Sequence, residues 1–259
     1  MNTDVPPAVA PLALPRGGFW RRWLATVIDT IIIMLPFQIL AAILFSVTAG
    51  MVQMDSGFFT VCTVSKDIPQ VQFDPRPPHD SNFSRTCRIS FFGPTTGAIL
   101  TVGRVTREGA MTTTVSQGYM LDKAGNPIRG YSIDWIVWLT LLVYLVAMIR
   151  KSGRTLGDRA TRLMVIDTAS PNAAGVPLGK AFIRYLAMAI GFVPMLAILL
   201  YQRVAVGGTA DEIFTVSFFH WFMAAGVLAI VWCILLIVQV ARKRDPYYDR
   251  LGGTAVVRI

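Results

Sequence analysis

Long apolar segments separated by polar ones set the pattern of this chain. Crossing a hydrocarbon core of about 30 Å takes about 20 helical residues. Four segments meet that requirement and are predicted to be transmembrane helices: residues 24–49, 133–149, 181–201 and 214–240. We therefore predict an α-helical integral membrane protein with four transmembrane helices, whose first partner is the lipid bilayer.

The segment between the first two predicted helices, residues 50–132, has a different character. It contains short runs rich in β-branched and aromatic residues, separated by clusters of Pro, Gly, Asn and Asp, which is typical of strands and turns. The runs are Phe59–Val64, Cys87–Phe91, Ile99–Val102 and Met111–Val115, followed by an expected hairpin at Tyr119–Tyr131. The sequence predicts a small β-rich insert between helices 1 and 2.

The composition supports a membrane protein, and the distribution of charge predicts its orientation in the membrane. Hydrophobic residues make up 54% of the chain, charged residues 15%, and the mean hydropathy is +0.54. Of the 24 Lys and Arg residues, fifteen fall in or beside three short segments: the tail 1–23, the loop 150–180 and the tail 241–259. Eight of the others are spread over the insert, and Arg203 lies in the short loop 202–213.

Basic residues in short flanking segments mark the cytoplasmic side of a membrane. The distribution predicts cytoplasmic termini, a periplasmic insert and a multi-pass protein of the bacterial inner (plasma) membrane. The net charge of +9 is then a topology signal. It does not indicate binding to nucleic acid.

The first predicted helix resembles a cleavable signal peptide in having basic residues ahead of it and small residues at Val47–Ala49. A signal core has about 7 to 15 apolar residues. This apolar segment is longer and also contains Asp29 and Pro36. We therefore predict an uncleaved signal anchor.

Two cysteines, Cys62 and Cys87, lie in the insert, where a translocated compartment is oxidising. We expect a disulfide between them, which would stabilise a small domain by roughly 3 kcal/mol in the chain-entropy model. The alternative is a pair of buried free thiols. No metal site is expected, because His79 is the one histidine of the insert and the spacing fits no zinc pattern.

Asp29 is an acid inside the first apolar segment, where an ionisable side chain costs about 2.5 to 3.5 kcal/mol at the helix centre. It shares a helical face with Arg22 and Thr26, and Pro36 on the same face frees a backbone carbonyl. One interpretation is a site for a small cation or a relayed proton. The other is a structural ion pair between Asp29 and a basic residue such as Arg184.

Three blocks carry a resemblance to the RDD family of bacterial membrane proteins, named for one arginine and two aspartates. They are Phe19–Asp29, Gly153–Gly157 leading to Leu163–Asp167, and Tyr247–Val257. On that match Arg22, Asp29 and Asp249 take the places of the three named residues. The chain departs from the family pattern at three positions: Asp158 stands where a lysine is usual, Thr161 replaces a glycine, and Tyr248 stands where a histidine is common.

The resemblance implies a membrane protein of a family proposed to transport ligands, with cation/proton antiport suggested for some members. The residues add that Arg162–Thr168 and Thr254–Ile259 alternate as strands do and are predicted to pair. That pairing would bring Asp249 to the inner ends of helices 1 and 3. Four residues are then expected to form one buried charge network: Asp29, Arg22, Asp249 and Arg184.

Two functions remain open and a third is disfavoured. The first is a small-ligand or cation/proton transporter. The second is a non-catalytic accessory or assembly subunit, either homo-oligomeric or part of a larger membrane complex contacted through the periplasmic insert. An enzyme is disfavoured, because no nucleophile and base, metal-ligand cluster or phosphate loop is recognisable. No cofactor is expected.

Overall fold

The computed structural model describes residues 15–109, 111–202 and 215–259. Two predicted segments lie mostly outside the described residues. They are the N-terminal tail, of which residues 1–14 are not described, and the loop 202–213, of which only Gln202 is described. Within the described chain, four helical segments are long and apolar enough to cross a membrane. They are α1 (Phe19–Val47), α2 (Asp134–Ser152), the segment Leu178–Tyr201 and α7 (Val216–Ala241). These lengths and compositions are those of a multi-pass membrane protein.

The third of these segments is not one uninterrupted helix. It consists of α4 (Leu178–Ala189), a 3₁₀ turn (Ile190–Phe192) and α5 (Val193–Tyr201). The turn contains Gly191, at which an added Cβ would lie 2.5 Å from the Trp232 ring of α7. The helix is therefore interrupted at Gly191, and the glycine allows Trp232 to approach the backbone closely.

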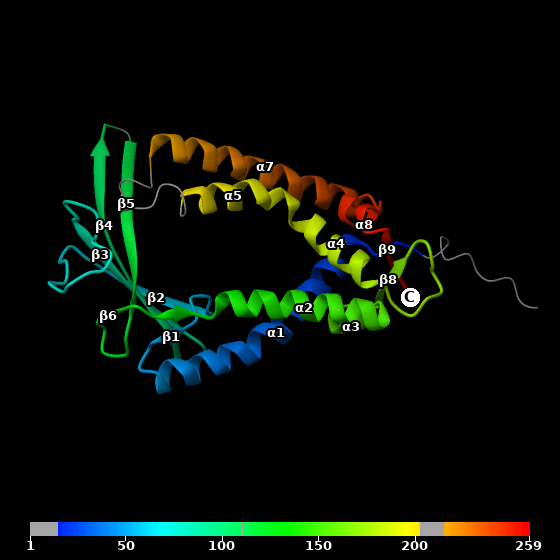
Figure 1. The fold of residues 1–259 in the computed structure, drawn as a ribbon, viewed down its shortest axis with the longest axis horizontal. Helices are drawn as coiled ribbons and strands as arrows, with labels where there is room; N and C mark the ends of the chain where they lie inside the picture. Colours follow the sequence, from blue (N-terminus) through cyan, green and yellow to red (C-terminus); the bar gives the residue numbers. More distant parts are fainter. Residues whose placement is uncertain (1–14, 110, 203–214) are drawn as a thin grey trace, which may run out of the picture. The chain divides into compact units, whose positions relative to one another are not determined.

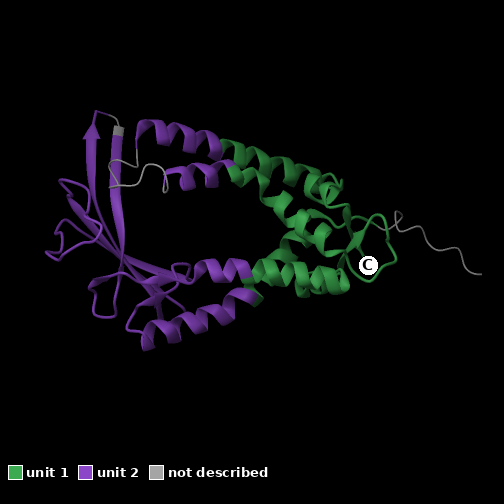
Figure 2. Ribbon diagram, viewed as in Figure 1, with its two compact units in different colours: residues 1–32, 140–193, 227–259 green, residues 33–139, 194–226 purple. Residues whose placement is uncertain are grey.

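The chain divides into two compact units, each described here by itself (Figure 2). Unit 2 comprises residues 33–139 and 194–226. It contains a five-stranded antiparallel sheet in the order β2-β3-β4-β5-β6. The strands are β2 (Phe59–Ser65), β3 (Phe83–Ser90), β4 (Thr95–Glu108), β5 (Met111–Leu121) and β6 (Pro127–Ile128). The β-rich region predicted between helices 1 and 2 is confirmed.

Unit 2 also contains parts of the long helices and two short strands, β1 (Val52–Gln53) and β7 (Tyr131–Ser132), which pair in parallel. Gln53 is fully buried; its amide donates to the carbonyls of Gly50 and Leu121, and its side-chain oxygen accepts from the Ala98 N–H. Phe45, near the end of α1, belongs to the core of the sheet. One buried amide thus joins the end of α1, β1, β4 and β5.

The expected disulfide is present. Cys62 of β2 and Cys87 of β3 stand directly opposite each other in the antiparallel ladder and are bonded. The predicted hairpin at Tyr119–Tyr131 is also present, with β5 and β6 paired through Met120 and Ile128.

Unit 1 comprises residues 1–32, 140–193 and 227–259, described from residue 15. Besides parts of the long helices it contains two short helices, α3 (Leu156–Thr161) and α8 (Tyr247–Leu251), and a two-stranded sheet. Its strands, β8 (Leu163–Asp167) and β9 (Thr254–Arg258), pair antiparallel as predicted. Leu163 and Val165 from β8 and Val256 from β9 pack on Ala25 of α1 and Ile149 of α2, and this core supports the polar residues described next.

Candidate functional site

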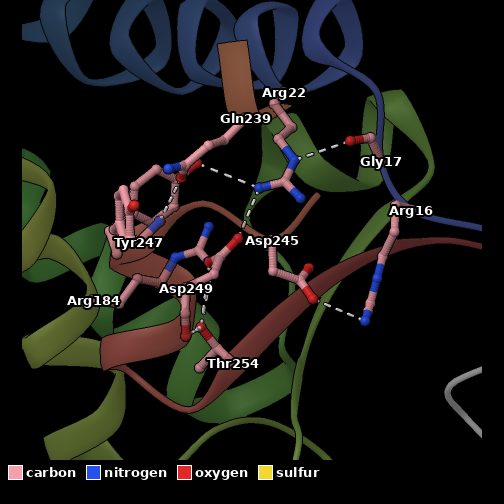
Figure 3. A network of polar contacts seen from close by, with 10 residues as sticks. Arg16, Gly17, Arg22, Arg184, Gln239, Asp245, Tyr247, Asp249 and Thr254 are labelled. Carbon is pink, nitrogen blue, oxygen red and sulfur yellow. Dashed lines mark hydrogen bonds and ion pairs between the residues drawn. The ribbon is translucent and has the colours of Figure 1, made fainter. Parts of the chain in front are cut away.

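Asp249 is the centre of a buried ion-pair cluster in unit 1 (Figure 3). It lies in the first turn of α8 and is fully buried. Its Oδ2 accepts from Arg22 of α1 at 2.8 Å, and its Oδ1 accepts from Arg184 of α4. Two long helices are therefore joined through one carboxylate.

Neighbouring groups hold the two arginines in place. The Arg22 Nε donates to the Gly17 carbonyl at 3.1 Å, and its Nη1 also donates to the Tyr248 hydroxyl at 3.3 Å. The Arg184 guanidinium lies 5.2 Å from the centre of the Tyr248 ring, a cation–π distance. Arg184 also donates to Thr254 at 3.3 Å. A buried charge is tolerated only when it is paired and hydrogen-bonded. Both guanidinium groups are paired with Asp249, but the buried Nε of Arg184 has no hydrogen-bond partner among the described residues.

Asp29 is bound separately, by three donors from α2 and α3. The side chain is 3% exposed. Its Oδ1 accepts from the Tyr144 hydroxyl at 2.9 Å and from the Gly157 N–H at 2.8 Å. Its Oδ2 accepts from the Thr155 hydroxyl at 2.6 Å. All three donors are uncharged, so hydrogen bonds and not an ion pair hold this carboxyl.

The first residues of α3 are placed to hydrogen-bond with Asp29. Thr155 caps the helix, and Asp158 accepts from the Thr155 N–H at 3.1 Å to complete a capping box. Gly157 is required by contact: an added Cβ would lie 2.1 Å from the Ala25 carbonyl oxygen and 2.9 Å from Cγ of Asp29. Without a side chain at this position, the backbone of α3 reaches hydrogen-bonding distance of α1.

A cavity of about 140 Å³ lies beside both groups of residues, entirely within unit 1. Its charged lining consists of Arg22, Asp29, Asp158 and Arg184. Burial raises the pKa of the Asp158 carboxyl, against the opposing effects of the Thr155 N–H and the Arg184 charge. With Asp249, the cluster holds three carboxyl groups and two guanidinium groups.

Comparison with protein-family models, curated proteins and solved structures gave no match to the chain. What the site can do therefore follows from its own side chains. Among the described residues, no group of three His, Cys, Asp or Glu side chains is placed to hold a metal ion. The chemistry at hand is that of carboxyl groups with hydroxyl donors beside a small cavity, which suits a proton or a small cation.

The structure brings together three of the four residues expected to form one charge network: Arg22, Arg184 and Asp249. Asp29 lines the same cavity but pairs with neither arginine among the described contacts. The alternative of an Asp29–Arg184 pair is not what the structure has, because Arg184 lies against Asp249. The Thr26 hydroxyl donates to the Arg22 carbonyl at 3.0 Å, and Thr26 also lines this cavity.

Sequence reasoning missed the direct partners of these acids. Tyr144 was not singled out, although a polar ring in the middle of an apolar segment is a usable signal. Thr155 and Gly157 belong to the block Gly153–Gly157, which stands out in the sequence only through its resemblance to the RDD family. The contact of the Tyr248 ring with Arg184 could not be predicted from a single sequence, because it depends on how α8 packs on α4.

Proposed function

We propose that the chain is an RDD-like multi-pass protein of the bacterial inner membrane that moves a small cation or a proton through the cavity beside Asp29. The observation that carries the proposal is the composition of this cavity, in which Asp29 and Asp158 face a space of about 140 Å³. That volume suits water or a small ion and is too small for most metabolites. The resemblance of three sequence blocks to the RDD family, some of whose members are suggested to be antiporters, supports the same function.

The proposed orientation has both termini and the loop 150–180 in the cytoplasm and the insert in the periplasm. Its support is the distribution of basic residues, fifteen of 24 in or beside three short segments. In this orientation the cavity lies near the cytoplasmic ends of the helices, because its lining includes Arg22 and Asp158. Reporter fusions after residue 259 and within the insert test the orientation.

The proposed mechanism uses an imbalance of charge. When every group is ionised, Asp29, Asp158 and Asp249 together with Arg22 and Arg184 carry a formal charge of −1. Both arginines already pair with Asp249. A proton or a monovalent cation in the cavity balances the remaining charge, and exchange of one for the other couples their movement.

The test is ion flux in proteoliposomes that contain a pH-sensitive dye, driven by a sodium or potassium gradient. Asp29→Asn keeps the size of the side chain and one acceptor for Tyr144 and Gly157, so the protein is expected to insert and to lose flux. Asp245→Asn is the matched control, because Asp245 pairs with Arg16 at a partly exposed position of the same unit. Wild-type flux in Asp29→Asn would refute the proposed role of this carboxyl.

A second candidate function, a non-catalytic accessory or assembly subunit of a larger membrane complex, is favoured by the edge of the sheet in unit 2. Strand β2 is an edge strand, with Val61 and Val64 exposed along it. Such an edge is a ready template for a strand of another protein. Extraction of a tagged copy from its native membrane in mild detergent, followed by mass spectrometry, tests this. A stoichiometric partner together with absent flux in proteoliposomes would favour this second function.

A further inference from the structure

Four phenylalanines form an exposed cluster at one corner of the sheet in unit 2. Phe58 precedes β2 and Phe59 is its first residue, and Phe91 and Phe92 lie in the turn between β3 and β4. Their ring centroids are 5.0 to 6.1 Å apart in four contacting pairs. Even so, Phe58 is 46%, Phe59 50% and Phe92 70% exposed. The cluster is therefore an apolar surface and not part of a core.

The cluster is fixed at the start of the candidate span α2. The Asp134 carboxylate, in the first turn of α2, accepts from the backbone N–H groups of Asp55 and Ser56 at 2.7 and 3.1 Å. Phe58 follows Ser56 by two residues, which places the two Cα atoms within about 7 Å. The cluster therefore lies close to the N-terminal end of the apolar helix α2.

A second helix contacts the same segment, residues 54–56. Gln38 of α1, fully buried, donates to the Ser56 carbonyl. Gln38 precedes the end of α1 at Val47 by nine residues, or about 14 Å along the axis. Met54 packs with Ala41 in the same core. Residues 54–56 therefore fold back against the apolar body of α1, and the phenylalanines follow directly.

The neighbourhood has the composition of a membrane interface. Trp135 and Trp138 lie in the first turns of α2 and are 64% and 60% exposed, as expected of aromatic anchors at the level of the lipid headgroups. The two segments that carry the phenylalanines, residues 56–65 and 89–103, contain no Asp, Glu, Lys or Arg. An exposed aromatic cluster on two uncharged segments, near the end of α2 that carries these tryptophans, matches lipid better than water.

We propose that Phe58, Phe59, Phe91 and Phe92 insert into the outer leaflet of the bilayer and anchor the sheet of unit 2 to the membrane surface. The proposal rests on the proposed membrane insertion of α1 and α2. The anchor gives the sheet a second attachment besides its covalent links to these helices, and so restricts its orientation on the membrane.

Electron paramagnetic resonance of spin-labelled protein in liposomes tests the anchor. Each label is attached to a single introduced cysteine in a Cys233→Ala background, in which Cys62 and Cys87 remain bonded. Phe92→Cys and Phe58→Cys probe the cluster. Leu40→Cys, exposed on α1, is the bilayer control, and Thr106→Cys, exposed on β4, is the aqueous control.

At positions 92 and 58 the label is expected to collide more with oxygen than with a water-soluble nickel chelate, as at position 40 and opposite to position 106. Chelate-dominated relaxation at 92 and 58, with position 40 still oxygen-dominated, would overturn the anchor and leave the spans intact. Low access of both reagents to the labels at 92 and 58 would show that protein covers the cluster, and this too would overturn the anchor. Chelate-dominated relaxation at position 40 would overturn the spans and the anchor together.

Discussion

Gly157 is the position at which the site is most sensitive to a single methyl group. Replacing it by alanine places a Cβ 2.1 Å from the Ala25 carbonyl oxygen, 2.8 Å from the Ala25 carbonyl carbon and 2.9 Å from Cγ of Asp29. The first two are backbone atoms of a long helix and cannot move aside as a flexible side chain would. The start of α3 must therefore shift by about 1 Å to reach an ordinary contact distance.

The cost has two parts. Overpacking of a well-packed site costs about 1 to 3 kcal/mol. The shift also weakens the hydrogen bond from the Gly157 N–H to the Asp29 carboxylate, and bonds to charged groups contribute about 1.5 to 3 kcal/mol. Gly157→Ala is therefore expected to destabilise the protein by about 3 to 6 kcal/mol. At about 2 to 4 °C per kcal/mol, the unfolding midpoint should fall by roughly 6 to 24 °C.

The measurement is the apparent unfolding midpoint in one detergent, followed by intrinsic fluorescence. Gly179→Ala is the matched control, because nothing lies within 4 Å of a Cβ at that position of α4. It should leave the midpoint unchanged or raise it slightly, since alanine is favoured over glycine in a helix. A Gly157→Ala midpoint within 2 °C of the control would show that α3 does not approach α1 as closely as described.

Three further predictions concern the charged groups and the disulfide. Asp249→Ala leaves two buried guanidinium groups without their acid and should cost about 3 to 5 kcal/mol in unfolding experiments, whereas Asp245→Ala at a partly exposed pair should cost less than about 1 kcal/mol. Burial raises the pKa of Asp158, so its ionised form opposes folding. The contribution of this group to stability is greatest below its ordinary pKa of 3.8 and is lost as pH rises through the raised pKa, so the difference in unfolding midpoint between Asp158→Asn and the wild type should change across that pH range. Replacing Cys62 and Cys87 together by serine should destabilise the sheet of unit 2 by about 3 kcal/mol, measurable as faster proteolysis of the insert, and added reductant should have the same effect on the wild type but none on the variant.

The helices and the sheet of unit 2 were predictable because their signals are local. A long apolar segment or a β-branched run between turn residues specifies its element without reference to the rest of the chain. The boundaries were less well specified. Helix α1 begins at Phe19, five residues before the predicted start at residue 24, because residues 19–23 contain no Gly or Pro to end the helix.

The partners of the buried acids could be predicted only where the sequence pattern showed that two elements pair. Pairing of β8 with β9 was visible as strand alternation, and it correctly suggested that Asp249 lies near the first and third long helices. The partner of Arg184 was open between Asp29 and Asp249. The packing of α3 and α8 decides between them. Uncharged donors of α3 hydrogen-bond to Asp29, and Arg184 pairs with Asp249 of α8.

The three sequence blocks that suggest an RDD protein meet around one cavity in unit 1. The first contributes Arg22 and Asp29, the second Thr155 and Val165, and the third Tyr248 and Val256. Two of the three departures from the family pattern, Asp158 and Tyr248, line this cavity. An acid in place of a lysine changes the formal charge of the lining by two. In the proposed function, an acid at this position favours a cation in the cavity, whereas a lysine would repel it.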